Sequence, residues 1–97
     1  MMNRVMARQK EDVTVLQLRL KKLIGQLNGI SKMLEGDTPC EDILVQFNAV
    51  NGALHKISLM VLENHLRHCV RDGIESGNAD ETIESFAEAL ENFSKMA

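Results

Sequence analysis

The stretch ENHLRHC, residues 63–69, gathers two of the three histidines and one of the two cysteines of a 97-residue chain. His65 and Cys69 are four residues apart, so on a helix they share one face, one turn above the other. Thiolate and imidazole at this spacing are donors for a transition metal, and a thiol here could also undergo redox chemistry. Two ligands do not complete a site, so further donors must come from elsewhere.

The second cysteine, Cys40, precedes His65 by 25 residues. On a helix advancing about 100° per residue, Cys40, His65 and Cys69 point within roughly 40° of one another. Cys40 and Cys69 would nevertheless lie about 43 Å apart along a straight helix. An antiparallel pairing of two copies would bring Cys40 of one chain beside His65 and Cys69 of the other. The alternative is that each cysteine is a small buried hydrophobe, and we interpret His55 and His68 as solvated.

The elements that must position these residues are helices. Apolar residues from Leu16 to Leu34 recur in steps of four and three, which predicts a helix from about Asp12 to Glu35, ended by Gly36. Thr38, Pro39 and Glu41 form a capping box that starts a second helix, which runs to Asp72–Gly73. After a linker, GIESGNAD, a third and shorter helix presents one apolar stripe: Ile83, Phe86, Ala87, Leu90 and Phe93. The sequence predicts an all-α, single-domain chain over residues 1–97, with residues 1–11 flexible.

Composition narrows the class of protein. The chain has no Trp or Tyr, so its core must be aliphatic, and no apolar run approaches the roughly 18 residues of a membrane span. Its N-terminus lacks the apolar segment of a secretory signal, so we expect a cytoplasmic protein that does not enter a membrane. In that compartment two cysteines favour metal or thiol chemistry over a structural disulfide.

The net charge of −3 conceals an asymmetry. Residues 1–32 carry seven basic side chains against two acidic ones (+5), whereas residues 33–97 carry four basic against twelve acidic ones (−8). Arg19, Lys22 and Gln26 project away from the leucine seam of the first helix, and Lys56 joins them from the second. A basic surface on an acidic body suggests contact with a polyanion such as double-stranded DNA, although a merely solvated helix face is the plainer alternative.

The chain resembles the small helical repressors of the CsoR/RcnR/FrmR family, in RLKKLIGQLNGISKMLEGDTPC and again in LENHLRHCV. The resemblance covers about residues 16–74 and includes a specific pattern: Cys, His 25 residues later, and Cys four further. It implies a three-helix protomer that forms an antiparallel homodimer and then a dimer of dimers. In the copper-sensing branch these positions supply Cu(I) ligands across the dimer interface, here Cys40, His65 and Cys69. The resemblance also implies a role in operator binding for Arg19 and Lys56, which match basic positions of the family.

The types of metal-ligating residue distinguish the branches of this family. Two thiolates and one imidazole are a soft set that suits Cu(I) better than Ni(II) or Co(II). The nickel and cobalt branch uses an N-terminal histidine, where this chain has Arg8, and a nitrogen ligand at the position of Cys69. The formaldehyde branch lacks the last cysteine. Copper sensors of the family usually carry Tyr before the first cysteine, where this chain has Pro39.

We therefore expect a cytoplasmic repressor that binds operator DNA without its effector and is released by Cu(I). Two alternatives use the same thiols: a persulfide-sensing repressor, modified at Cys40 and Cys69 without a metal, and a copper carrier that needs no basic surface. The persulfide branch typically lacks the histidine. Enzymatic function is not expected, because no phosphate loop, carboxylate pair or nucleophile–base set is present.

Overall fold

The protein is described by a computed structural model in which residues 10–96 are defined. The elements are α2 (Lys10–Glu35), α3 (Cys40–Asn64), the π-helical turn η1 (His65–Val70), α4 (Arg71–Glu75) and α5 (Ala79–Ser94). Residues 10–96 contain helices and turns but no strand, which confirms the predicted all-α class. Helix α2 begins at Lys10, two residues before the predicted start near Asp12. The flexibility of residues 1–11 stays a prediction, and residues 1–9, including Arg8, lie outside the described residues.

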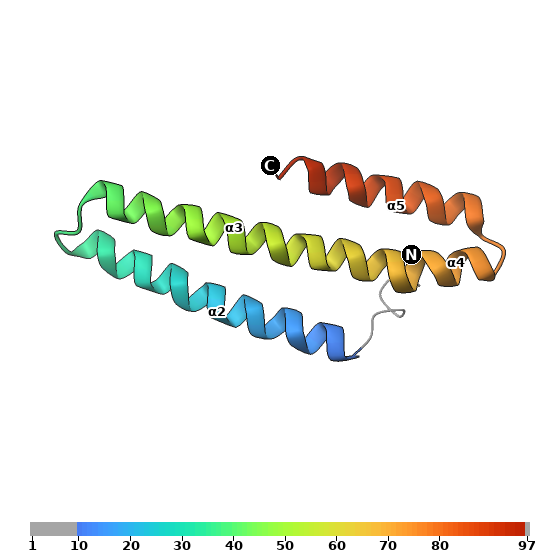
Figure 1. Cartoon of the computed structure of the whole chain (residues 1–97), viewed down its shortest axis with the longest axis horizontal. Coiled ribbons are helices and arrows are strands. Elements are labelled where there is room, and N and C mark those ends of the chain that lie inside the picture. The colour runs from blue at the N-terminus through green and yellow to red at the C-terminus, as the bar shows by residue number, and fades with distance from the viewer. Residues whose placement is uncertain (1–9, 97) are drawn as a thin grey trace.

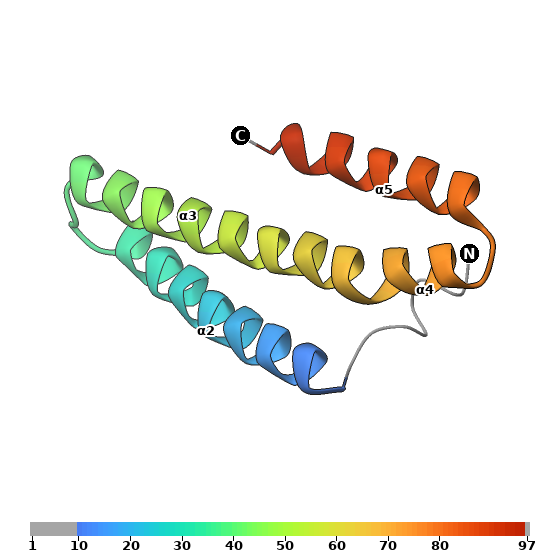
Figure 2. The same ribbon diagram turned by 45° about the vertical axis from the view of Figure 1, so that its right-hand side comes forward.

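The helices form an elongated molecule, 59 × 26 × 16 Å. Elements α3, η1 and α4 follow one another without a break and make one long central rod (Figure 1). Helix α2 packs antiparallel along one side of this rod, and α5 folds back along the other side (Figures 1 and 2). The rod therefore lies between the two outer helices and contacts both of them.

The turn between α2 and α3 holds the first cysteine. Helix α2 ends at Glu35 and α3 begins at Cys40, with Pro39 as the N-cap residue in an extended conformation (φ −61°, ψ 147°). The predicted Thr38 cap is therefore wrong by one residue: the cap has no side-chain hydrogen bond, and the carbonyl of Pro39 instead accepts from the amides of Asp42 (3.1 Å) and Ile43 (3.3 Å). Cys40 thus occupies the first helical position.

The corner between α4 and α5 is tighter than predicted. The rod continues to Glu75, and only residues 76–78 separate it from α5, so the predicted linker over residues 73–80 is mostly helical. Gly77 has a φ of +91°, a conformation that favours glycine. Gly73 is needed for a different reason, because a β-carbon there would overlap the side chain of Thr82 in α5.

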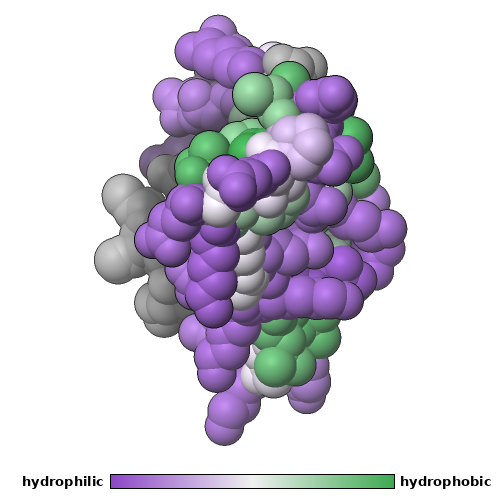
Figure 3. Space-filling model, turned by 90° about the vertical axis from the view of Figure 1, so that its left-hand side faces the viewer, coloured by the Kyte–Doolittle hydropathy of each residue, from purple (hydrophilic) through white to green (hydrophobic). Residues whose placement is uncertain are grey.

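The core between α2 and α3 uses only half of the predicted seam. Leu16 and Leu23 pack with Ile57, and Val50, Ala53, Met60 and Val61 surround them. The seam positions between the buried ones remain exposed, because a single partner helix covers only part of each apolar stripe: Leu20 (41%), Leu27 (43%), Leu34 (63%), Phe47 (43%) and Leu54 (39%). Viewed onto the α2–α3 turn, apolar surface lies open between hydrophilic side chains (Figure 3).

Candidate metal centre and nucleic-acid interface

His65 and Cys69 lie on the π-helical turn η1, which replaces the regular α-helix expected here. A π-helical turn has i→i+5 hydrogen bonds, winds more loosely than an α-helix, and is found frequently at functional sites. The constant step of 100° per residue therefore fails across residues 65–70. His65 and Cys69 still belong to one turn of the backbone, while the placement of the Cys69 side chain lies outside what the structure describes.

His65 is half-buried beneath α5. Its ring stacks on Phe86, with ring centroids 5.7 Å apart and an interplanar angle of 14°. The Nε2 atom of His65 is buried. Sequence reasoning missed this contact, because the only available signal was the pair Phe86 and Phe93, seven residues apart on one face of the third helix, and that signal does not say what the rings meet.

Cys40 is an exposed, free thiol at the first position of α3. Continuous helix separates it from His65, which puts the two residues about 38 Å apart at 1.5 Å per residue. Within residues 10–96, apart from the undescribed Cys69 side chain, one protomer contains no group of three metal-ligating side chains. Whether Cys40, His65 and Cys69 bind a metal together remains a prediction that needs a second copy.

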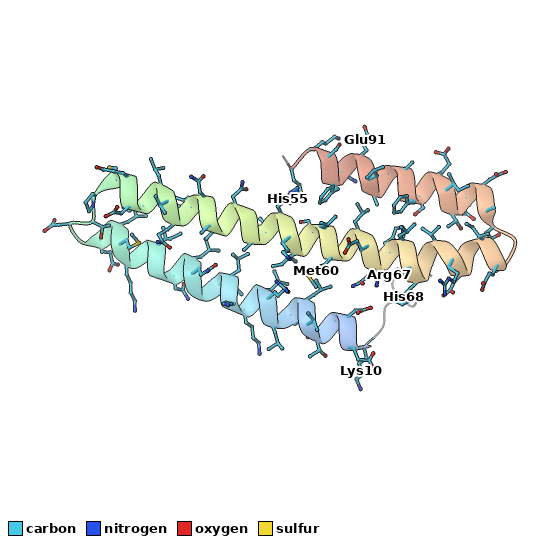
Figure 4. The ribbon with its side chains drawn as sticks, viewed as in Figure 1. Lys10, His55, Met60, Arg67, His68 and Glu91 are labelled. Atoms are coloured by element: carbon cyan, nitrogen blue, oxygen red, sulfur yellow. The ribbon has the colours of Figure 1, made fainter. Side chains whose placement is uncertain are left out.

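The other two histidines also have neighbours. His68 is half-buried, and its Nε2 lies 3.3 Å from Oδ2 of Asp12 in the first turn of α2, so its interpretation as a solvated residue was wrong. His55 is exposed as expected, yet its ring lies against Phe93 of α5 at a centroid distance of 4.9 Å. Figure 4 shows His55 near the end of α5, whereas Met60 and His68 lie on the α2 side of the rod. The histidines of the rod therefore contact α2 through His68 and α5 through His55 and His65.

The four residues predicted to contact DNA are all exposed: Arg19, Lys22, Gln26 and Lys56. Spacings of three and four residues place the first three on one face of α2. Lys56 precedes Ile57, which packs with Leu16 and Leu23, so it lies level with Arg19 along the helix pair. These positions are compatible with a shared basic surface, and their contact with DNA remains a prediction.

Residues 12–92, from the start of α2 to nearly the end of α5, match the family model described as metal-sensitive transcriptional repressor. The chain belongs to this family. The match confirms the predicted family and places the protein among regulators of transcription, not among enzymes. Within residues 10–96 no helix is both long and apolar enough to cross a membrane.

Individual relatives agree with this assignment. The chain is 38% identical to the copper-sensing transcriptional repressor CsoR of Bacillus subtilis, over 97% of this chain and 90% of that protein. It is 42% identical to the copper-sensing repressor RicR of Mycobacterium tuberculosis, over 61% and 62% of the two chains.

Two solved structures share the fold. CsoR with Cu(I) from Geobacillus thermodenitrificans superposes with a TM-score of 0.83 at 34% identity, covering 90% of this chain and 91% of that one. The nickel-responsive regulator InrS gives a TM-score of 0.76 at 30% identity, over 82% and 90% of the chains.

Proposed function

We propose that this protein is a cytoplasmic copper-sensing repressor. It binds operator DNA in the effector-free state and is released when Cu(I) binds between subunits to Cys40 of one protomer and to His65 and Cys69 of the other. The relatives named above that span most of the chain support a metal-responsive repressor, and two of them are copper sensors. The proposal adds the ligands, the DNA-contacting residues and the assembly.

The observation that carries the proposal is an exposed stripe along α3. Cys40, Phe47 and Leu54 are seven residues apart, so they share one helix face, and all three are exposed in the single protomer. The stripe runs from Cys40 toward η1, which holds His65. Two copies joined antiparallel along this stripe bury its apolar residues and bring Cys40 to His65 of the partner subunit. A homodimer with two equivalent sites follows, and two dimers would form the homotetramer expected from the family resemblance.

The donor set fits Cu(I). Two thiolates and one imidazole are soft ligands in a low coordination number, whereas Ni(II) favours additional nitrogen donors. The likeness to InrS therefore supports the fold more strongly than it supports nickel as the effector. When bound, the metal would hold donors from two protomers together, while in the protomer alone continuous helix keeps Cys40 and His65 about 38 Å apart.

A contact between η1 and α2 within the protomer supports a coupling between the proposed metal site and the proposed DNA surface. His68 lies on η1 between the two proposed ligands, and it contacts Asp12 at the start of α2. Helix α2 carries Arg19, Lys22 and Gln26. A change in η1 on effector binding would thus act on the helix that holds most of the proposed DNA contacts. Thermodynamic linkage requires DNA to weaken Cu(I) binding by the same factor by which Cu(I) weakens DNA binding.

The test is an anaerobic gel-shift series on the DNA upstream of the protein's own operon. Wild type and His65→Ala are each titrated with Cu(I) and, separately, with tetrasulfide. We expect Cu(I) to release wild type from DNA and His65→Ala to lose this response, because its site has lost the imidazole. Both thiols remain in the variant, so it can still bind copper. The gel shift measures release from DNA and therefore detects the loss of the response even when copper is bound.

Two other outcomes would identify the competing functions. Release of wild type by tetrasulfide but not by Cu(I), with His65→Ala responding like wild type, would show a persulfide sensor that uses only the cysteines. The titration with tetrasulfide is included because this chain has Pro39 where copper sensors of the family usually have Tyr. Absence of any salt-dependent DNA binding would instead indicate a copper carrier.

A further inference from the structure

The family resemblance leaves the third helix without a role, and its contacts suggest one. Helix α5 touches the rod through two phenylalanine rings: Phe86 stacks on His65, and Phe93 lies against His55. Only the first of these histidines is a proposed metal ligand. We propose that Phe86 is a positioning residue that holds the imidazole of His65 in the orientation the inter-subunit site uses. This inference rests on the function proposed above.

Helix α5 contacts the rod on both sides of Phe86. At one end, the close approach of Gly73 to Thr82 sets the angle between α4 and α5, and the amide of Asn78 donates to the carbonyl of Gly73 (2.9 Å). At the other end, Phe93 rests on His55 with ring centroids 4.9 Å apart. Phe86 lies between these two anchor points. Phe86 therefore sits on a segment of α5 that contacts the rod before and after it.

The stacking on Phe86 restricts rotation of the His65 imidazole. A nearly parallel ring at 5.7 Å opposes rotation of the imidazole out of its plane, and the buried Nε2 shows that one edge of the ring faces the protein interior. His65 itself lies on the π-helical turn η1. A ligand held in place before the metal arrives loses less conformational freedom on binding, and groups behind a ligand tune metal affinity.

The experiment compares three variants of the full-length protein. Phe86→Leu removes the ring but keeps an apolar side chain, Phe86→Tyr keeps the ring, and Phe93→Leu removes the matched ring that faces His55. Cu(I) affinity is measured anaerobically by competition with a chromophoric Cu(I) chelator. In the metal-free protein, NMR relaxation of the His65 ring CH groups is measured, because it reports how freely the imidazole reorients. Thermal unfolding reports the general loss of packing in each variant.

We expect Phe86→Leu to weaken Cu(I) binding about fivefold, which is about 1 kcal/mol, and to increase the mobility of the His65 ring seen in NMR relaxation. Phe86→Tyr should restore both, and Phe93→Leu should lower the melting temperature without changing Cu(I) affinity. Equal losses of affinity in the two leucine variants would reduce Phe86 to a packing residue and overturn the inference, as would a mobility of the His65 ring that does not respond to Phe86→Leu. A wild-type protein that binds no Cu(I) would instead refute the proposed copper function, and the metal-free NMR comparison would still decide whether Phe86 holds the imidazole.

Discussion

At the scale of single residues, sequence reasoning identified candidates better than it identified their neighbours. The spacing of His65 and Cys69 is a local property, so one turn of helix was enough to predict that they belong together. The contacts of His68 with Asp12 and of His65 with Phe86 join residues 56 and 21 positions apart, and no periodic pattern links them. These contacts depend on how the helices pack, and His68, which was predicted to be solvated, instead contacts α2.

The basic residues yield a prediction at this scale. Arg19→Ala and Lys56→Ala should each weaken operator binding and lower the slope of log affinity against log salt by about 1, because each removes one phosphate contact. Cu(I) affinity should not change. Affinity for DNA is measured by fluorescence anisotropy at several salt concentrations. Lys95→Ala serves as the control, since it deletes the same charge from an exposed position beyond α5. Equal salt slopes in all three variants would argue against the proposed DNA surface.

At the scale of elements, helix periodicity predicted three helices and the turn after Glu35, but it did not predict the π-helical turn within the rod. The sequence from Leu59 to Val70 is suited to a continuous α-helix, and the π-helical turn over His65–Val70 arises where α5 packs on one side and Asp12 of α2 contacts the other. Such a turn depends on packing, so propensity cannot reveal it. The error at Thr38 was smaller, because Pro39 takes an extended conformation and delays the helix by one residue.

The contact between η1 and α2 can be tested as a link between effector and DNA. Asp12→Asn should reduce the factor by which Cu(I) weakens DNA binding about two- to threefold, the modest size expected for a partly exposed pair. Affinities for Cu(I) alone and for DNA alone should stay near wild type. Glu11→Gln is the matched control, because it removes an acidic group from the same first turn of α2. A coupling factor that falls equally in both variants would indicate a general charge effect on α2.

At the scale of the whole molecule, the sequence showed that the helices carry long apolar seams but not which half faces the protomer's own core. In the structure, Leu16, Leu23 and Ile30 are buried, whereas Leu20 and Leu27 between them remain exposed. Phe47 and Leu54 repeat this on α3. An exposed apolar stripe of this length favours an interface with a second copy. We therefore predict an assembly of two chains, in which the metal site would form between protomers.

The assembly is tested by placing a charge among the exposed seam residues of α2, which we expect the dimer to bury together with Phe47 and Leu54 of α3. Leu27→Glu should leave a folded helical protomer, because the side chain is 43% exposed there, but it should dissociate the dimer, where a carboxylate would be buried. Leu18→Glu is the control: Leu18 is 61% exposed and lies on the opposite side of α2, so its variant should keep the mass of wild type in light scattering. Because Cys40 can reach His65 only in the partner subunit, the monomeric Leu27→Glu protein should also lose high-affinity Cu(I) binding. High-affinity binding by a monomer would contradict the inter-subunit site directly, since about 38 Å of helix separates the two ligands within one chain.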